Sequence, residues 1–219
     1  MLVSMARLGV TAAAVLVCVL TACTIPPTGD PVPQPSPESD AIRMAAVGDS
    51  ITDADSEDFA GGILGPQSWV SYAISEEIEF VGGWAEWSAS TARMAEEVQQ
   101  PFDADVLVIV AGTNDAGWTP HDEIGENLSR IADAAAVDAV MLSSVPPNDF
   151  NRDATVELNA YLERFASDAG WTWVDAAADV RDGDRFAEGT SYDGVHPTEQ
   201  GARAIGEAIG AAILDGADQ

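Results

Sequence analysis

The stretch "VLVIVAG", residues 106–112, decides the fold class of this sequence. Its first five positions, Val106 to Val110, are all apolar, so neither side of an extended segment would present a polar group to solvent. A strand with this pattern is covered on both faces, which is the usual situation in a parallel sheet. The polar residues that follow Gly112, "TND", favour a turn. We therefore expect a central strand here, with a loop at its carboxyl end.

Similar short apolar segments occur on both sides of this stretch and alternate with amphipathic segments. The pattern predicts strands at 42–47, 78–82, 106–112, 139–145 and 171–176, and helices at 67–77, 91–99, 121–136, 154–169 and 198–214. Strands and helices in alternation form a parallel sheet with right-handed crossovers, covered by helices on both faces. The expected fold class is therefore α/β, a three-layer α/β/α sandwich with a roughly five-stranded parallel sheet.

The chain length and composition limit the classes of partner. With 219 residues, the chain has room for one well-buried domain. Nine arginines, no lysine and 37 carboxylates produce a formal net charge of -28. Binding to phosphates requires cationic side chains, so the composition argues against a nucleic acid partner and against an anionic lipid surface recognised through charge.

The N-terminal segment differs from the rest of the sequence. Residues 8–20, "LGVTAAAVLVCVL", form an apolar run of 13 residues, shorter than the roughly 20 that a spanning helix needs. We interpret residues 1–22 as a signal peptide. Leu20 to Cys23 resemble a bacterial lipobox, which predicts lipidation of Cys23 and an extracytoplasmic protein anchored to the cell membrane by lipid alone. A secreted form without the anchor and an uncleaved anchor are the alternatives.

The expected domain organisation follows from this interpretation. Residues 23–41 are rich in proline and small polar residues, which is typical of an extended spacer. The folded domain would then occupy residues 42–219. Because Cys18 and Cys23 are the only cysteines in the sequence, this domain contains no thiol and no disulfide.

Three polar segments lie where a site is expected. In open parallel sheets, ligands bind at the carboxyl ends of the strands. "GDS" at 48–50 follows the first expected strand, "GTND" at 112–115 follows the third, and "DGVHP" at 193–197 precedes the last helix. A serine hydroxyl becomes a nucleophile when a base takes its proton, and a histidine serves as that base when a carboxylate holds its tautomer. Ser50, His196 and Asp193 are thus candidate catalytic residues.

These three segments, in this order and spacing, resemble the SGNH hydrolases, also called GDSL esterases and lipases. The resemblance covers roughly residues 42–214. It implies a flavodoxin-like sheet, a catalytic triad of Ser50, His196 and Asp193, and an oxyanion hole that includes Ser50 and Asn114. With only two histidines in the sequence and no cysteine in the folded domain, we expect no metal site and no cofactor.

One segment departs from the family pattern. The family usually has a glycine after the second strand whose backbone N–H is an oxyanion donor, and "WSASTARM" at 87–94 places Ser88 at that position. A serine at this position still has a backbone N–H, so it can still act as the donor. The alternatives for the second donor are Gly82 and Gly83.

Three tryptophans, Trp84, Trp87 and Trp118, follow the second and third expected strands and are candidates to line a substrate cleft, with packing in the core as the alternative. The other three, Trp69, Trp171 and Trp173, are expected in the core.

The predicted function is a serine esterase that hydrolyses small acyl esters, such as acetyl or short-chain esters of carbohydrate or lipid, through an acyl-enzyme. A small-molecule or glycan ester is the expected substrate. Two alternatives share the same residues: a catalytically silent module that binds a glycan, and an acyltransferase that passes the acyl group to a sugar hydroxyl.

Overall fold

The computed structural model describes residues 40–217. These residues belong to one compact unit. The expected signal peptide, Cys23 and the spacer as far as residue 39 lie outside the described residues.

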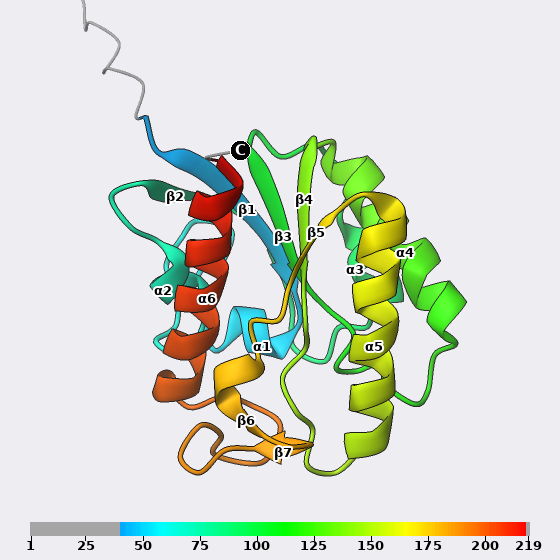
Figure 1. Cartoon of the computed structure of the whole chain (residues 1–219). Helices are drawn as coiled ribbons and strands as arrows, with labels where there is room; N and C mark the ends of the chain where they lie inside the picture. Colours follow the sequence, from blue (N-terminus) through cyan, green and yellow to red (C-terminus); the bar gives the residue numbers. More distant parts are fainter. Residues whose placement is uncertain (1–39, 218–219) are drawn as a thin grey trace, which may run out of the picture. The chain divides into compact units, whose positions relative to one another are not determined.

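A five-stranded parallel sheet forms the centre of the domain (Figure 1). The strands are β1 (Ile42–Gly48), β2 (Ile78–Ala85), β3 (Val106–Val110), β4 (Ala139–Ser143) and β5 (Thr172–Val174). Their order across the sheet is β2-β1-β3-β4-β5, and every pair of neighbours is parallel. This is the flavodoxin-like order, in which the connections after β1 and β3 leave toward opposite faces and open a crevice at the carboxyl edge. The predicted fold class is confirmed.

Helices cover both faces of the sheet, as Figure 1 shows. One face packs against α2 (Val70–Ala73) and α6 (Glu199–Ala217). The other packs against α3 (Thr91–Glu97), α4 (His121–Ala135) and α5 (Arg152–Ala169). Among the described helices, none is long and apolar enough to span a membrane.

The alternation of side chains along β3 explains its uninterrupted apolar sequence. Leu107 and Ile109 belong to the core on the α3, α4 and α5 side, whereas Val106, Val108 and Val110 belong to the core on the α2 and α6 side. Successive side chains of a strand point to opposite faces, so a strand between two helical layers needs apolar residues at every position.

Two predicted elements are shorter than expected. The helix predicted at 67–77 is helical only at Val70–Ala73, because the chain is already extended at Ile74 and Ser75 donates its N–H to the Ile78 carbonyl on the way into β2. The strand predicted at 171–176 is reduced to Thr172–Val174 at the edge of the sheet. Between β5 and α6 the chain forms a 3₁₀ turn (Ala178–Val180) and a small hairpin of β6 (Arg181–Asp182) and β7 (Arg185–Phe186).

Candidate active site

The turn from β1 into the short helix α1 (Ser50–Asp53) presents Ser50 at the carboxyl edge of the sheet. Asp49 caps this helix, since its Oδ1 accepts a hydrogen bond of 3.0 Å from the Ile51 N–H. A Cβ at Gly48 would lie 2.0 Å from the Thr52 hydroxyl oxygen, so the turn requires glycine there. The Ser50 N–H occupies the first helical position, where a helix offers it no partner.

The structure brings Ser50, His196 and Asp193 together in one chain of hydrogen bonds. The Ser50 Oγ lies 3.0 Å from His196 Nε2, although the two residues are 146 positions apart. On the other side of the ring, His196 Nδ1 lies 2.7 Å from Asp193 Oδ2. This is the arrangement in which an imidazole can take the serine proton while a carboxylate holds its other N–H.

The loop around Asp193 fixes the orientation of this carboxylate. Its Oδ1 accepts backbone hydrogen bonds from His196, at 2.7 Å, and from Val195, at 2.9 Å. Burial by itself would raise the pKa of Asp193, but the hydrogen bonds from the His196 backbone and ring and from Val195 outweigh it, and the pKa lies below its usual value. Asp193 is therefore ionised at neutral pH and favours a proton on Nδ1 of His196.

Two aromatic rings contact the imidazole. The Trp87 ring stacks on His196 with a centroid distance of 5.1 Å, and the Tyr192 ring does so at 5.8 Å. The Ser191 hydroxyl adds a 2.7 Å hydrogen bond to the His196 carbonyl. These contacts restrict the rotation of the ring, so Nε2 stays directed at Ser50.

The loop that follows β2 links the triad to Asn114. Trp87 in this loop contacts His196, and the carbonyl of Ala89 accepts a 2.9 Å hydrogen bond from the Asn114 side-chain amide. The carboxylate of Asp115, which is fully buried, accepts hydrogen bonds from the N–H and the hydroxyl of Thr91. These bonds connect the loop after β3 to the start of α3. The loops after β1, β2 and β3 and the loop before α6 therefore meet at one location.

Ser88 has the backbone conformation that a glycine would favour. Its φ is 61°, in the left-handed region, and within the described chain its N–H donates no hydrogen bond. Gly82 and Gly83 instead lie inside β2, paired with Ala45 and Ala46 of β1. A Cβ at Gly83 would lie 1.9 Å from the Ala46 carbonyl oxygen, so close strand packing accounts for this glycine. Of these three residues, only Ser88 lies beyond the strand end.

The three tryptophans proposed for the cleft occupy different places. Trp87 borders the small cavity beside Ser50. Trp84 lies within β2 and packs against the core, so the prediction that it lines the cleft is not supported. Trp118 is highly exposed and borders a separate hollow between its own loop and α5. Trp69, Trp171 and Trp173 pack in or against the core, as predicted.

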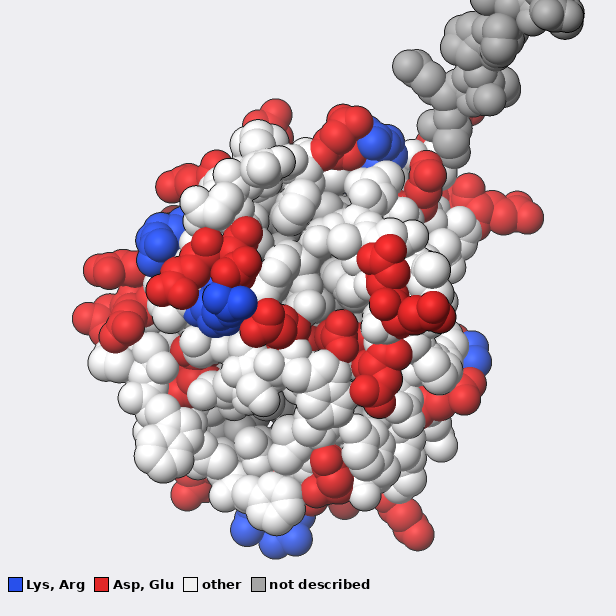
Figure 2. Space-filling model, turned by 180° about the vertical axis from the view of Figure 1, so that it is seen from behind, with Lys and Arg blue, Asp and Glu red and all other residues white. Residues whose placement is uncertain are grey.

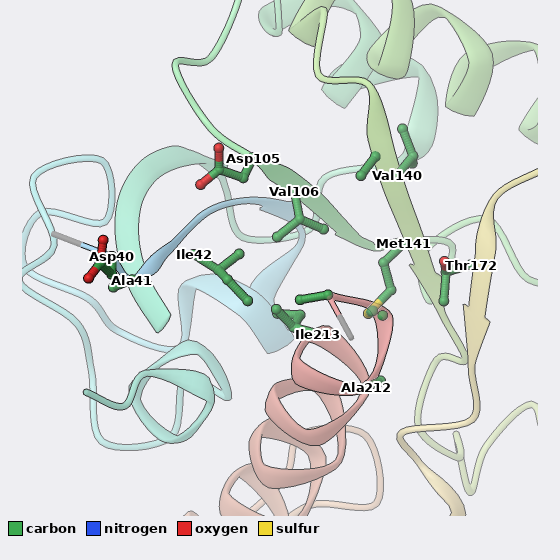
Figure 3. Close-up of a pocket in the computed structure, with 13 residues that line it drawn as sticks. Asp40, Ala41, Ile42, Asp105, Val106, Val140, Met141, Thr172, Ala212 and Ile213 are labelled. Atoms are coloured by element: carbon green, nitrogen blue, oxygen red, sulfur yellow. The ribbon is translucent and has the colours of Figure 1, made fainter. Parts of the chain in front are cut away.

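The cavity beside Ser50 is small. Its volume is about 10 Å³, and its lining includes three residues that sequence reasoning missed, Asp55, Gln67 and Tyr192. Tyr192 was detectable as the neighbour of Asp193, whereas Asp55 and Gln67 reach the cavity only through the folding of the 54–67 loop. A larger hollow of about 340 Å³ lies at the amino ends of the strands and contains none of the predicted site residues (Figure 3).

Asp49 is a fully buried carboxyl group next to Ser50. Its Oδ2 and the Thr113 hydroxyl oxygen are the two buried side-chain atoms of the described residues that have no hydrogen-bond partner of normal geometry. Burial raises the pKa of Asp49 from 3.8 to about 6, although the hydrogen bond from Ile51, the nearby Thr113 hydroxyl and the charge of His196 act in the opposite direction.

This raised pKa predicts a specific dependence of stability on pH. The folded protein holds the Asp49 proton more tightly than the unfolded chain, so the contribution is fully present below pH 3.8 and is lost as the pH rises through about 6. Relative to Asp49→Asn, the free energy of unfolding of the wild type should fall by about 2 kcal/mol between pH 4 and pH 7. Urea denaturation of both proteins at several pH values measures this difference. Parallel pH profiles would contradict it.

Comparison with known proteins agrees with this geometry. A curated relative, an acetylxylan esterase from Xylanibacter ruminicola, is 29% identical over 220 aligned positions, which cover 82% of this chain and 44% of the relative. The chain thus spans less than half the length of that relative. Among solved structures, the fold is similar to a variant of Axe2, an acetyl xylan esterase from Geobacillus stearothermophilus, with a TM-score of 0.64, 18% identity and coverage of 78% and 94% of the two chains. It is also similar to a GDSL-like lipase from Bacteroides thetaiotaomicron, with a TM-score of 0.62, 20% identity and coverage of 84% and 93%.

The flavodoxin-like sheet and the hydrogen-bonded serine, histidine and aspartate at its carboxyl edge define the class of α/β serine hydrolases. The model of the GDSL-like lipase/acylhydrolase family matches residues 46–204, which is most of the chain. The protein belongs to this family.

Proposed function

We propose that the protein is a serine esterase that removes small acyl groups, above all acetyl groups, from carbohydrate or lipid esters. The observation that carries the proposal is the continuous path from the Ser50 hydroxyl through His196 to Asp193, with distances of 3.0 and 2.7 Å. Both distances lie within the hydrogen-bond range in which a side chain can transfer a proton, and they support the proposal.

The proposed reaction is acyl transfer to water through an acyl-enzyme. The Ser50 Oγ attacks the ester carbonyl carbon while its proton moves to His196 Nε2. The tetrahedral intermediate collapses as the carbon–oxygen bond to the alcohol breaks and the imidazolium returns the proton to the leaving oxygen. A water molecule then attacks the acyl-Ser50 ester, with His196 again accepting a proton, and releases the carboxylic acid.

Three N–H groups are proposed to stabilise the oxyanion: the backbone N–H groups of Ser50 and Ser88 and the side-chain amide of Asn114. One hydrogen of the Asn114 amide is bonded to the Ala89 carbonyl, which positions the group and leaves its second hydrogen for the substrate. The left-handed backbone of Ser88 supports its assignment as the second donor over Gly82 and Gly83. Such donors act on charge that appears in the transition state, and losing one typically reduces the rate by about 10²–10³.

The size of the cavity beside Ser50 supports a small acyl group. A volume of about 10 Å³ is roughly what one water molecule needs, and this matches a methyl group far better than an alkyl chain. The similarity to an acetylxylan esterase supports an acetylated carbohydrate as the alcohol side of the ester.

Purified protein and an active-site-directed fluorophosphonate test the proposal against the alternative of a silent glycan-binding module. We expect turnover of 4-nitrophenyl acetate, a sharp fall in rate as the acyl chain lengthens, and covalent labelling of Ser50. A folded protein that neither turns over short esters nor reacts with the probe would refute the esterase and favour the binding module.

We also propose that the mature protein is exported and anchored through lipidated Cys23. The lipobox-like sequence Leu20 to Cys23 and the proline-rich residues after it support this proposal. Mass spectrometry of the N-terminal peptide would test it through the presence or absence of acyl groups on Cys23.

A further inference from the structure

Exposed aromatic side chains gather at one edge of the sheet. In the part of the chain that the structure describes, four aromatic residues are classed as exposed: Trp118 at 86%, Phe150 at 80%, Tyr192 at 53% and Trp87 at 43%. They follow β3, β4, β7 and β2, respectively, in loops around the carboxyl edge where Ser50 lies. The other large exposed apolar residues are aliphatic. An aromatic ring in each of four separate loops is not explained by core packing.

These four residues, which we call the aromatic rim, lie on loops that are joined to each other. Trp87 and Tyr192 both stack on His196. The Phe150 ring lies over Gly194, because a Cβ built there would be 3.4 Å from it, and the neighbouring Asp149 donates its N–H to the Gly194 carbonyl at 2.8 Å.

The connection continues from Phe150 to Trp118. Asn151 donates its side-chain amide to the Ala116 carbonyl at 2.7 Å, which ties the loop of Phe150 to that of Trp118. Beyond Trp118 lies the hollow that its loop forms with Ala154 and Glu157 of α5. The aromatic rim therefore runs outward from the triad as one connected set of loops.

We propose that the aromatic rim binds the sugar residues that flank the acylated one, so that the substrate is an uncharged glycan chain of several residues. This proposal rests on the proposed esterase function and specifies its substrate class. A pyranose ring presents an apolar C–H face that packs on an aromatic face, while its hydroxyl groups need polar partners at the ring edge. The rim offers both, because the polar side chains of Asp149 and Asn151 flank Phe150 in the sequence.

The net charge of the molecule and the origin of the four rings in separate loops disfavour other occupants. A protein or membrane interface usually presents contiguous apolar surface, whereas the four rings of the rim come from four separate loops, and two of them pack on His196. Acidic side chains outnumber basic ones on the face that Figure 2 shows, and the whole chain has a formal charge of -28. A polyanionic glycan or an anionic lipid would be repelled by this field, and an uncharged glycan would not.

The test compares substrates that differ only in chain length. Wild-type protein is given acetylated xylose, glucose and mannose and the corresponding acetylated β-1,4-linked tetrasaccharides, with 4-nitrophenyl acetate as the minimal ester. We expect at least one tetrasaccharide to have a kcat/KM about tenfold or more above that of its monosaccharide. Trp118→Ala and Phe150→Ala should each lower kcat/KM for that tetrasaccharide about tenfold, mainly through KM, and lower it for 4-nitrophenyl acetate much less.

A matched control is Val156→Ala, which removes a similarly exposed apolar side chain from α5 and should change none of these values. Equal kcat/KM for tetrasaccharides and monosaccharides would overturn the rim proposal. Variants that lose activity equally on every substrate would also overturn it. Neither result would contradict the proposed esterase function. If the protein hydrolyses no ester, the proposed function fails instead. In that case the rim proposal is tested by the binding of unacetylated tetrasaccharides, measured by tryptophan fluorescence. Weaker binding by Trp118→Ala than by the wild type would support the rim proposal. No binding by the wild type would overturn it.

Discussion

Replacing Ser50 with alanine should lower kcat for 4-nitrophenyl acetate by about 10⁴–10⁶-fold, because no other group then forms the acyl-enzyme. The Ser50 side chain is buried, and its Oγ forms a 3.0 Å hydrogen bond with His196 Nε2. Removing a single oxygen leaves the cap of α1 intact, since Asp49 supplies it. The fold should therefore be preserved, and fluorophosphonate labelling should disappear together with turnover.

A suitable control is Ser129→Ala, in which the lost hydroxyl bonds only the Gly125 carbonyl within α4. This variant should keep wild-type kcat and labelling. Retention of more than a tenth of the activity by the folded Ser50→Ala protein would rule out Ser50 as the nucleophile.

Replacing Asp193 with asparagine should lower kcat by about 10³–10⁴-fold with little effect on the fold, because it changes the tautomer of His196. The two backbone N–H groups of Val195 and His196 hold Oδ1 of Asp193, so the asparagine oxygen would take that position. Its amide N–H would then face His196 Nδ1 and donate a hydrogen bond to it, so that Nδ1 carries no proton. The remaining ring proton would sit on Nε2, where it prevents acceptance of the Ser50 proton.

Initial rates with 4-nitrophenyl acetate and urea denaturation together check this prediction. Asp133→Asn, an exposed change on α4, is the control and should leave kcat unchanged. A loss smaller than tenfold in Asp193→Asn would show that the carboxylate does not set the tautomer.

Much of the fold was predictable because the apolar pattern that indicates each strand lies within a few consecutive residues. The strands β1, β3 and β4 lie between two helical layers, so their residues are apolar in nearly continuous runs that stand out in the sequence. The helix predicted at 67–77 was wrong over most of its length because an apolar periodicity does not reveal where the chain must turn into the next strand.

The candidate site was predictable for a related reason. Ser50, Asn114 and His196 each follow or precede a recognisable element in short motifs, and the topology of a parallel sheet brings strand ends to one edge. The tryptophans were less predictable. Trp84 and Trp87 are three residues apart, yet one packs against the core from within β2 and the other stacks on His196 from the loop beyond.

The sequence by itself determined the α/β class, the order of the elements and the residues able to carry out acyl transfer, because hydrophobic periodicity and short motifs are properties of neighbouring residues. Only the tertiary structure decided which groups meet. The contact between Ser50 and His196 spans 146 positions, and the loops of Phe150 and Trp118 are joined by a hydrogen bond from Asn151 to Ala116 that spans 35. Such contacts depend on how helices and strands pack across the whole domain, so a pattern of neighbouring residues does not predict them.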